Sequence, residues 1–391
     1  MLGKMTKSLL AFSSVLTACV MLFIIFFLFK EGIGLFRSSN IEKGYTLLVH
    51  ADNPVKELNS FEIKEIFDGK ISNWSQVGGK DIEIKPYRIG DYLKEHGEDI
   101  PLENLEAELA AYIGQHRHIL AFLPEKYAPV FNSSVKELPS HKVSFSDVFG
   151  GREWLPASSP APLFGALPLI GGTLLVSFLA ILIALPLGLG VAVYVAELAP
   201  VRIKKGMKVV VELLAGIPSV VYGFFGLVVL APLIQGVFAL SIGETALTGG
   251  VILAIMALPT IISVAEDALS NTPRALKEGS LALGATQWQT IRQVTFPHAR
   301  SGIMAAVVLG IGRALGETMA VLMVTGNAAV MPGSIFESVR TIPATIAAEL
   351  GESSTGGTHY QALFLLGALL FVVTMLTSVL ADIVTRKQVK S

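Results

Sequence analysis

The chain has 391 residues, of which 52% are hydrophobic and only 16% charged, and its net charge at pH 7 is −1. Because soluble globular proteins carry about 25% charged residues, this composition is typical of a membrane protein. Residues 31–162 hold 34 of the 61 charged residues, which leaves 27 for the other 259. We therefore expect a membrane-embedded chain with one water-soluble segment. The near-zero net charge argues against a nucleic-acid partner. The single cysteine, Cys19, excludes an intrachain disulfide and argues against a cysteine-based metal cluster.

Six apolar segments are long enough to cross a membrane, for which a helix needs about 20 residues. They lie roughly at residues 9–29, 164–195, 209–234, 245–264, 302–324 and 362–383. The second segment is longer than required and contains Pro186, so we expect it to tilt or kink. The first segment is followed by Lys30-Glu31-Gly32-Ile33, which offers no small-residue cleavage site. We therefore interpret it as a retained anchor rather than a signal peptide.

The basic residues of the short loops predict the orientation of the chain. With six spans, four basic groups fall on one side of the membrane: Lys4 and Lys7; Arg202, Lys204, Lys205 and Lys208; Arg274, Lys277, Arg292 and Arg300; and Arg386, Lys387 and Lys390. Both termini of this multi-pass protein are then cytoplasmic. The chain divides into an N-terminal anchor helix (1–30), an extracytoplasmic insert (31–162) and a membrane core with five spans (163–391).

The loop after the fourth span, residues 267–300, is the most specific signal in the sequence. Pro273 predicts a helix start, and Gly284 predicts the end of that helix. A second short helix is expected over residues 287–294, ending before Pro297. The loop is expected to be held close to the membrane by the apolar residues Leu281, Leu283 and Ile291. Such a helix pair presents a fixed shape to a cytoplasmic partner, but periodicity alone does not distinguish it from an ordinary amphipathic connector.

The amino-acid sequence of this loop resembles the EAA loop of ABC-importer permeases, in which a Glu-Ala-Ala triplet precedes a glycine and an Ile-x-Leu-Pro element. Glu278, Gly284 and Pro297 match this pattern at the family spacing, with departures at Gly279, Ser280 and Phe296. The resemblance implies that the loop docks in a groove of a separate ATPase subunit through Glu278, Gly284, Ala285 and Pro297. The sequence has no G-x-x-x-x-G-K-[ST] motif and thus no P-loop of its own, so an ATPase partner is required.

Three further stretches resemble the permease of the phosphate-specific ABC importer, the PstC type: residues 149–154, 216–226 and 310–318. The resemblance covers roughly residues 1–30 and 145–391. It implies an α-helical polytopic membrane protein with the type I ABC-importer permease fold and a small α/β insert. It also implies a transport subunit for inorganic phosphate in the bacterial inner membrane, not an enzyme. The implied partners are a homologous second permease, an ATPase subunit dimer, an extracytoplasmic phosphate-binding protein and membrane lipid, with no cofactor and no metal ion.

Two charged residues fall inside the predicted fifth span. Arg313 and Glu317 are four residues apart, which places them on one face of a helix. A lone arginine at the membrane centre costs about 2.5–3.5 kcal/mol, so such residues face a bundle interior or a water path. We interpret Arg313 as a positive element of an anion pathway, oriented or gated by Glu317; a self-satisfied structural pair is the alternative. Ser219, beside Pro218 in the predicted third span, is a further pathway candidate, against the simpler reading of a structural kink.

The insert carries two stretches that resemble phosphate-type extracellular binding proteins, residues 61–79 and 119–127. The anion-binding elements of that family are missing, because Arg88 is followed by Ile89-Gly90-Asp91 rather than Ser-Gly-Thr. We therefore predict a small α/β domain that does not bind phosphate tightly. Its 20 acidic residues against 14 basic ones also argue against an electrostatic anion trap. Docking or regulation of a separate binding protein and inert decoration both remain open.

Two other function classes compete with an ATP-driven permease. An ion-coupled secondary anion carrier would use Arg313 and Glu317 as its site, but the sequence shows no clear pair of matching halves of the kind that inverted repeats produce. A membrane ligand sensor would need a cytoplasmic output domain, and only eight residues follow Ile383. The substrate itself rests on the resemblance, since phosphonate or molybdate would use similar chemistry.

Overall fold

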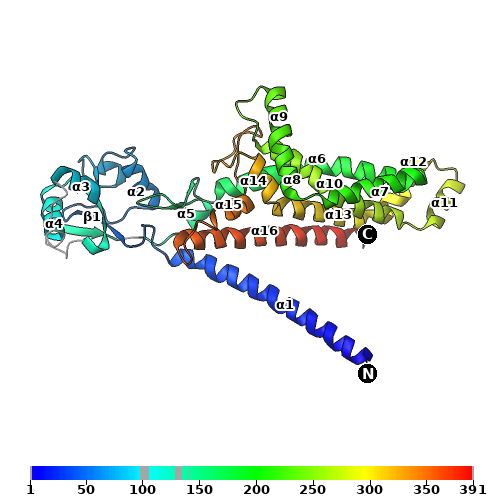
Figure 1. The fold of residues 1–391 in the computed structure, drawn as a ribbon, viewed down its shortest axis with the longest axis horizontal. Coiled ribbons are helices and arrows are strands. Elements are labelled where there is room, and N and C mark those ends of the chain that lie inside the picture. Colours follow the sequence, from blue (N-terminus) through cyan, green and yellow to red (C-terminus); the bar gives the residue numbers. More distant parts are fainter. Residues whose placement is uncertain (1, 97–104, 128–133, 140, 390–391) are drawn as a thin grey trace. The chain divides into compact units, whose positions relative to one another are not determined.

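The computed structural model describes residues 2–96, 105–127, 134–139 and 141–389, which form two compact units (Figure 1). The membrane unit comprises Met1–Phe29, Leu167–Ser353 and Leu363–Ser391. The insert unit comprises Lys30–Ala166 together with Ser354–Ala362, a segment from the far end of the chain.

The part of the chain that the structure describes contains six helical segments that are long and apolar enough to cross a membrane. They are Leu9–Arg37, Leu167–Leu198, Ser219–Phe238, Ala246–Ser270, Gln287–Gly316 and Thr358–Val379. The predicted number of spans and the helical membrane fold are thereby confirmed.

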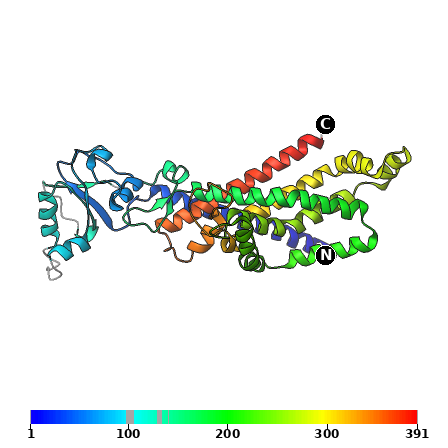
Figure 2. The same ribbon diagram turned by 90° about the horizontal axis from the view of Figure 1, so that it is seen from above.

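The helices of the membrane unit follow one another in the order drawn in Figure 1 and, in the turned view, in Figure 2. They are α1 (Leu2–Gly34), α6 (Leu167–Val193), α7 (Val201–Gly216), α8 (Ser219–Phe225), α9 (Ala231–Phe238), α10 (Ala246–Ser270), α11 (Arg274–Ala282), α12 (Gln287–Thr290), α13 (Phe296–Gly316), α14 (Met319–Val324), α15 (Ile342–Glu349) and α16 (Thr358–Val389). Three single π-helical turns continue α6, α8 and α12: η4 (Tyr194–Leu198), η5 (Gly226–Leu230) and η6 (Ile291–Thr295).

The helix at the centre of the membrane unit is α10. In the most apolar stretch of α10, 61% of the residues are buried, whereas the same share is at most 33% in the other five spans. It packs against α6 and α13 at small residues. A Cβ at Gly250 would lie 2.6 Å from Cβ of Leu179, and a Cβ at Gly302 would lie 2.3 Å from Cβ of Ala268. Small residues permit this close approach, which matters in lipid because no hydrophobic force draws the helices together there.

The third span differs from its prediction. The sequence predicts it at residues 209–234, but the structure begins it at Ser219. The chain is extended at Ile217 and Pro218, and the basic helix α7 is a separate element that ends at Gly216. A residue that precedes proline is disfavoured in the α region, so Pro218 separates two helices instead of kinking one.

The fifth span, predicted at residues 302–324, also differs at both ends, since the structure has it at Gln287–Gly316. The second short helix of the preceding loop does not end before Pro297, because α12 continues through η6 into α13. Pro297 is the second residue of α13, which directly follows the π-helical turn η6, so it lies inside this continuous helical segment. At the other end α13 stops at Gly316, and Glu317 has extended backbone angles, φ −70° and ψ 132°.

The insert unit is built on a four-stranded mixed sheet in the order β2-β3-β1-β4. Its strands are β1 (Tyr45–His50), β2 (Lys85–Arg88), β3 (Ile119–Pro124) and β4 (Val135–Leu138), with β1 antiparallel to β3 and β4, and β2 parallel to β3. Its helices are α2 (Ser60–Phe67), α3 (Ile89–His96), α4 (Leu105–Gln115) and α5 (Phe145–Phe149), and β5 (Trp154–Leu155) pairs with β6 (Leu163–Phe164).

Each face of this sheet carries its own hydrophobic core. Side chains alternate along a strand, so Leu47 and Val49 of β1 pack with α2 and Trp74, whereas Leu48 packs with α4 on the opposite face. The insert unit is therefore the small α/β domain that the sequence predicts.

Glu95 of α3 joins three parts of the insert unit. Its Oε2 accepts hydrogen bonds from the hydroxyls of Tyr87 and Tyr112 at 2.7 and 3.0 Å, and its Oε1 accepts one from Nζ of Lys85 at 3.1 Å. These hydrogen bonds lower the pKa of Glu95 to about 2, and the hydrogen bond from Tyr87 has the largest effect.

We expect the insert unit to lose stability as the pH falls from 4.5 to about 2. The pKa of Glu95 is lower in the folded state, so its stabilisation is complete above the ordinary value and is lost as the carboxylate takes up a proton. Thermal unfolding of the purified full chain from about pH 2 to pH 6 measures this loss, and Glu95→Gln is expected to flatten it. Glu83→Gln, at an exposed residue of the same unit, is the control. A steep acid profile that persists in Glu95→Gln would contradict this assignment.

Candidate functional site

The loop between α10 and α13, residues 267–300, forms two short helices joined at a glycine. The first helix, α11, begins after Pro273, and the loop turns at Gly284, whose φ of +86° favours glycine. The second, α12, is capped by Thr286, which exchanges hydrogen bonds with Gln289. The predicted start, glycine break and helix pair are present in the structure.

Large apolar side chains are exposed along this loop. Leu283 is 91% and Trp288 63% exposed, and Leu276 and Leu281 are also exposed. Of the side chains predicted to hold the loop close to the membrane, only Ile291 is buried within the membrane unit. The residues predicted to meet an ATPase lie among these exposed positions: Glu278, Gly284 and Pro297 are exposed, and Ala285 is half-buried. Exposed apolar side chains of this kind are available to a partner protein or to the membrane.

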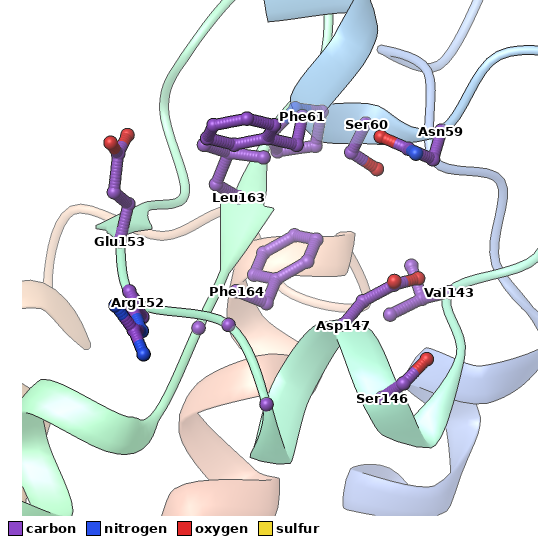
Figure 3. A pocket seen from close by; sticks show the side chains of 14 residues that line it. Asn59, Ser60, Phe61, Val143, Ser146, Asp147, Arg152, Glu153, Leu163 and Phe164 are labelled. Carbon is purple, nitrogen blue, oxygen red and sulfur yellow. The ribbon is translucent and has the colours of Figure 1, made fainter.

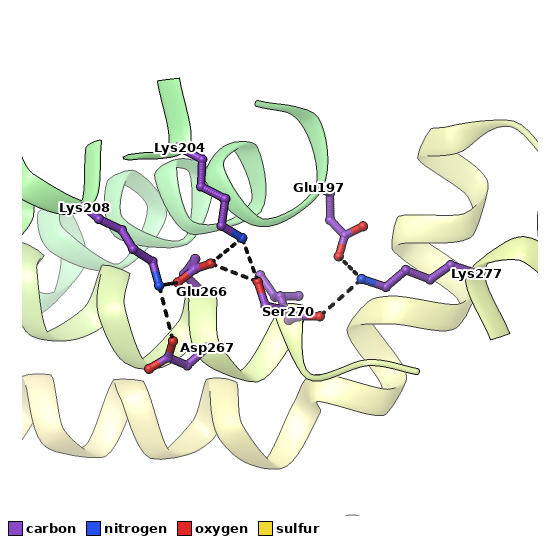
Figure 4. A network of polar contacts seen from close by, with 8 residues as sticks. Glu197, Lys204, Lys208, Glu266, Asp267, Ser270 and Lys277 are labelled. Carbon is purple, nitrogen blue, oxygen red and sulfur yellow. Dashed lines mark hydrogen bonds and ion pairs between the residues drawn. The ribbon is translucent and has the colours of Figure 1, made fainter. Parts of the chain in front are cut away.

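Figure 4 shows two groups of charged side chains, one that includes Lys277 of α11 and one around Glu266 of α10. In one, Nζ of Lys277 lies 2.6 Å from Oε1 of Glu197 in η4. In the other, the buried Glu266 carboxylate lies 2.8 Å from Nζ of Lys204 and 3.2 Å from Nζ of Lys208, and it raises the pKa of Lys208. The side chain of Glu197 is only 10% exposed. No sequence spacing signals this pair, because 80 positions separate its members.

Arg313 lies in the last turn of α13, half-buried, where its Nη1 donates a hydrogen bond to Oγ1 of Thr260 in α10 at 3.1 Å. The shared helix face predicted for Arg313 and Glu317 is not formed, because the helix ends between them at Gly316. Among the described residues the structure shows no ion pair between the two. Ser219 is the half-buried first residue of α8. No sequence pattern singles out Thr260, a threonine just after Pro259 in an apolar helix.

The insert unit contains a cavity of about 480 Å³ (Figure 3). It lies between the start of α2, helix α5 and the strand pair β5–β6, and Phe61, Asp147 and Phe164 are among the residues that line it. Arg88, the arginine considered in the sequence analysis, contacts other parts of the insert unit. Its Nη2 donates to the Ser159 carbonyl at 3.2 Å, and its guanidinium lies 5.3 Å from the Phe67 ring centre.

Comparison with known families identifies the membrane unit. Residues 184–390 match the family described as "Binding-protein-dependent transport system inner membrane component". The chain belongs to this family. It is thus a multi-pass component of a transport system in the bacterial inner membrane rather than an enzyme.

Curated relatives of this inner membrane component share much of its length. "Probable ABC transporter permease protein YqgH" of Bacillus subtilis is 45% identical over 223 residues, covering 57% of this chain and 72% of the relative. "Phosphate transport system permease protein PstC" of Mesorhizobium japonicum is 40% identical over 282 residues, covering 67% of this chain and 84% of the relative. Among solved structures, an inward-facing MetNI methionine ABC transporter is 23% identical, covering 57% of this chain and 96% of that chain, with a TM-score of 0.45.

The family match includes every site residue predicted for this transport component. Ser219, Arg313, Glu317 and the loop at 267–300 all lie within residues 184–390, whereas the insert at 31–162 lies outside them.

Proposed function

We propose that this chain is the permease subunit of an ATP-driven importer of inorganic phosphate. The observation that carries the proposal is the 40% identity to a phosphate transport permease across 84% of that protein's length. The chain would form part of the translocation path together with a homologous second permease. Both termini and the loop at 267–300 would then face the cytoplasm, and the insert would face the binding protein outside.

The loop at 267–300 is the proposed docking element for a dimer of ATPase subunits. Its exposed leucines and Trp288 would enter a groove of the ATPase, with Glu278, Gly284, Ala285 and Pro297 setting the shape of the contact. The hydrogen bonds within the loop support this role, because a rigid element transmits displacement better than a flexible one.

Leu283→Asp is therefore expected to weaken ATPase binding by at least about tenfold, since a buried leucine contributes about 1.5–3 kcal/mol. The stability of the chain itself should not change, because Leu283 is 91% exposed. Co-purification of the ATPase with the tagged permease measures the effect. Leu155→Asp, at an exposed leucine of the insert unit, is the matched control. Equal ATPase recovery from both variants would argue against this docking surface.

Arg313 is the proposed contact for the passing phosphate. A guanidinium donates two parallel hydrogen bonds to paired oxygens, which suits a tetrahedral oxyanion. The hydrogen bond from Nη1 of Arg313 to Oγ1 of Thr260 holds the guanidinium in place. Glu317 lies four positions further on, beyond the helix end, where it could gate the path without neutralising Arg313 directly. Ser219 at the start of α8 is a further candidate along the path.

The insert is proposed to dock or regulate the separate phosphate-binding protein rather than to bind phosphate itself. The contacts of Arg88 with the Ser159 carbonyl and the Phe67 ring support this, because they hold part of its guanidinium against the insert unit itself. Calorimetry of phosphate against the purified full chain tests it. Micromolar binding that survives Arg313→Gln would place phosphate in the insert and overturn this proposal.

The decisive test of the function is reconstitution of the permease pair, ATPase and binding protein in lipid vesicles. ATP-dependent accumulation of phosphate, lost when the ATPase is left out, is the expected result. Accumulation that continues without ATPase, driven by an ion gradient, would instead identify an ion-coupled carrier. Competition with phosphonate and molybdate would define the anion.

A further inference from the structure

The two short helices of the loop are both attached to one point at the end of the second span. From α11, Lys277 forms an ion pair with Glu197 at 2.6 Å (Figure 4). Both side chains are largely buried, 19% and 10% exposed. From α12, Nε2 of Gln287 donates a hydrogen bond to the backbone carbonyl of the same residue, Glu197, at 3.1 Å.

The loop behaves as one piece because α11 and α12 are also tied to each other. The hydroxyls of Ser280 and Thr290 lie 3.0 Å apart and share a hydrogen bond. A displacement of either helix is therefore passed to the other, and both act on Glu197.

Glu197 stands in a segment suited to receive such a displacement. It lies in η4, a π-helical turn, and turns of this kind are rare and often mark functional sites. Just before it, Ala192 and Val193 pack in one hydrophobic cluster with residues of α10, η6 and α13, including Ala265, Ile291 and Ile303. The end of the second span is thus coupled at once to the loop and to the helix core.

We propose that the Glu197–Lys277 ion pair is a positioning device that transmits movement of the ATPase-docked loop to the second span; this rests on the proposed function. An ion pair suits the role better than apolar packing alone. A charge-assisted hydrogen bond fixes distance and direction, and pulling the pair apart leaves a largely buried charge unpaired, which holds the two elements together. Glu197 and Lys277 touch no substrate and act only through the helices they join.

The proposal predicts a loss of coupling rather than a loss of assembly. Permease complexes carrying Glu197→Gln or Lys277→Met are reconstituted in vesicles, and phosphate uptake and ATP hydrolysis are measured on the same sample, per assembled complex. Uptake per ATP hydrolysed is expected to fall about tenfold in each single variant, within the range of typical coupling energies. The double exchange Glu197→Lys with Lys277→Glu is expected to restore most of it.

Lys205→Met is the charge-matched control, because this exposed lysine lies on α7 and the structure shows no ion pair for it among the described residues. It should leave uptake per ATP unchanged. A wild-type ratio in both single variants would overturn the proposal, and so would a lowered ratio that the charge exchange does not restore. Failure of the proposed function is distinguishable, since the unmodified complex would then show no ATP-dependent phosphate uptake at all.

Discussion

Replacing Arg313 with glutamine is expected to reduce ATP-dependent phosphate uptake to background while the complex still assembles. The substitution removes the cation and leaves a shorter, neutral polar side chain in place of the guanidinium that donates to Thr260. Hydrogen bonds to charged groups contribute about 1.5–3 kcal/mol each, so losing them weakens the contact with phosphate by about ten- to a hundredfold per bond. Uptake of labelled phosphate into reconstituted vesicles is the measurement, normalised to the amount of assembled complex.

Two companion variants separate a transport role of Arg313 from a structural one. Arg313→Lys keeps the charge but loses the planar fork and should transport poorly. Arg300→Gln removes the same charge from the exposed start of the same helix and should transport normally if only Arg313 lies on the path. Normal uptake by the Arg313→Gln variant would show that its contact with Thr260 serves helix packing alone.

Gly302→Val is expected to destabilise the membrane unit severely. A Cβ at this position would lie 2.3 Å from Cβ of Ala268, so α13 would have to move away from α10, the most buried helix of the unit. Overpacking in a close-packed interior typically costs about 1–3 kcal/mol, and a contact between two helix backbones has little room to relax. Thermal unfolding of the purified complex in detergent measures the loss.

The matched control lies on the same helix. Gly312→Val introduces the same β-branched side chain into α13 where the structure has no atom within 4 Å of the new Cβ. It therefore carries the propensity cost without the collision. Equal unfolding temperatures for the two variants would mean that the α10–α13 contact is looser than the structure has it.

The fold follows from the sequence where the signal is local. The length of each apolar run fixes the six spans, and Pro273 and Gly284 fix the first loop helix, because each signal acts within a few residues. The errors arise where a backbone choice depends on neighbours. Residues 209–234 read as one apolar run, and nothing in hydropathy says that Pro218 ends one helix and begins another.

The candidate site could be predicted only in part, for a similar reason. Arg313 stands out as a charge in an apolar run, but its partner Thr260 lies 53 positions away and is an unremarkable residue type. The 80 positions between Glu197 and Lys277 likewise hide a contact that only helix packing creates. The four-residue spacing of Arg313 and Glu317 predicts a shared face only if the helix continues past Gly316, and it does not.

The composition of the insert unit bears on how a water-soluble fragment should be cut for biophysical work. Its fold includes Ser354–Ala362, and Ser38 Oγ donates a hydrogen bond to Oε1 of Gln361 at 2.9 Å. Expression of residues 31–162 alone would therefore omit residues 354–362 and expose to solvent the surface that they cover in the full chain. A fragment that joins residues 354–362 to residues 30–166 through a short glycine-rich linker contains both segments of the insert unit. This fragment is the one to use for crystallisation and spectroscopy.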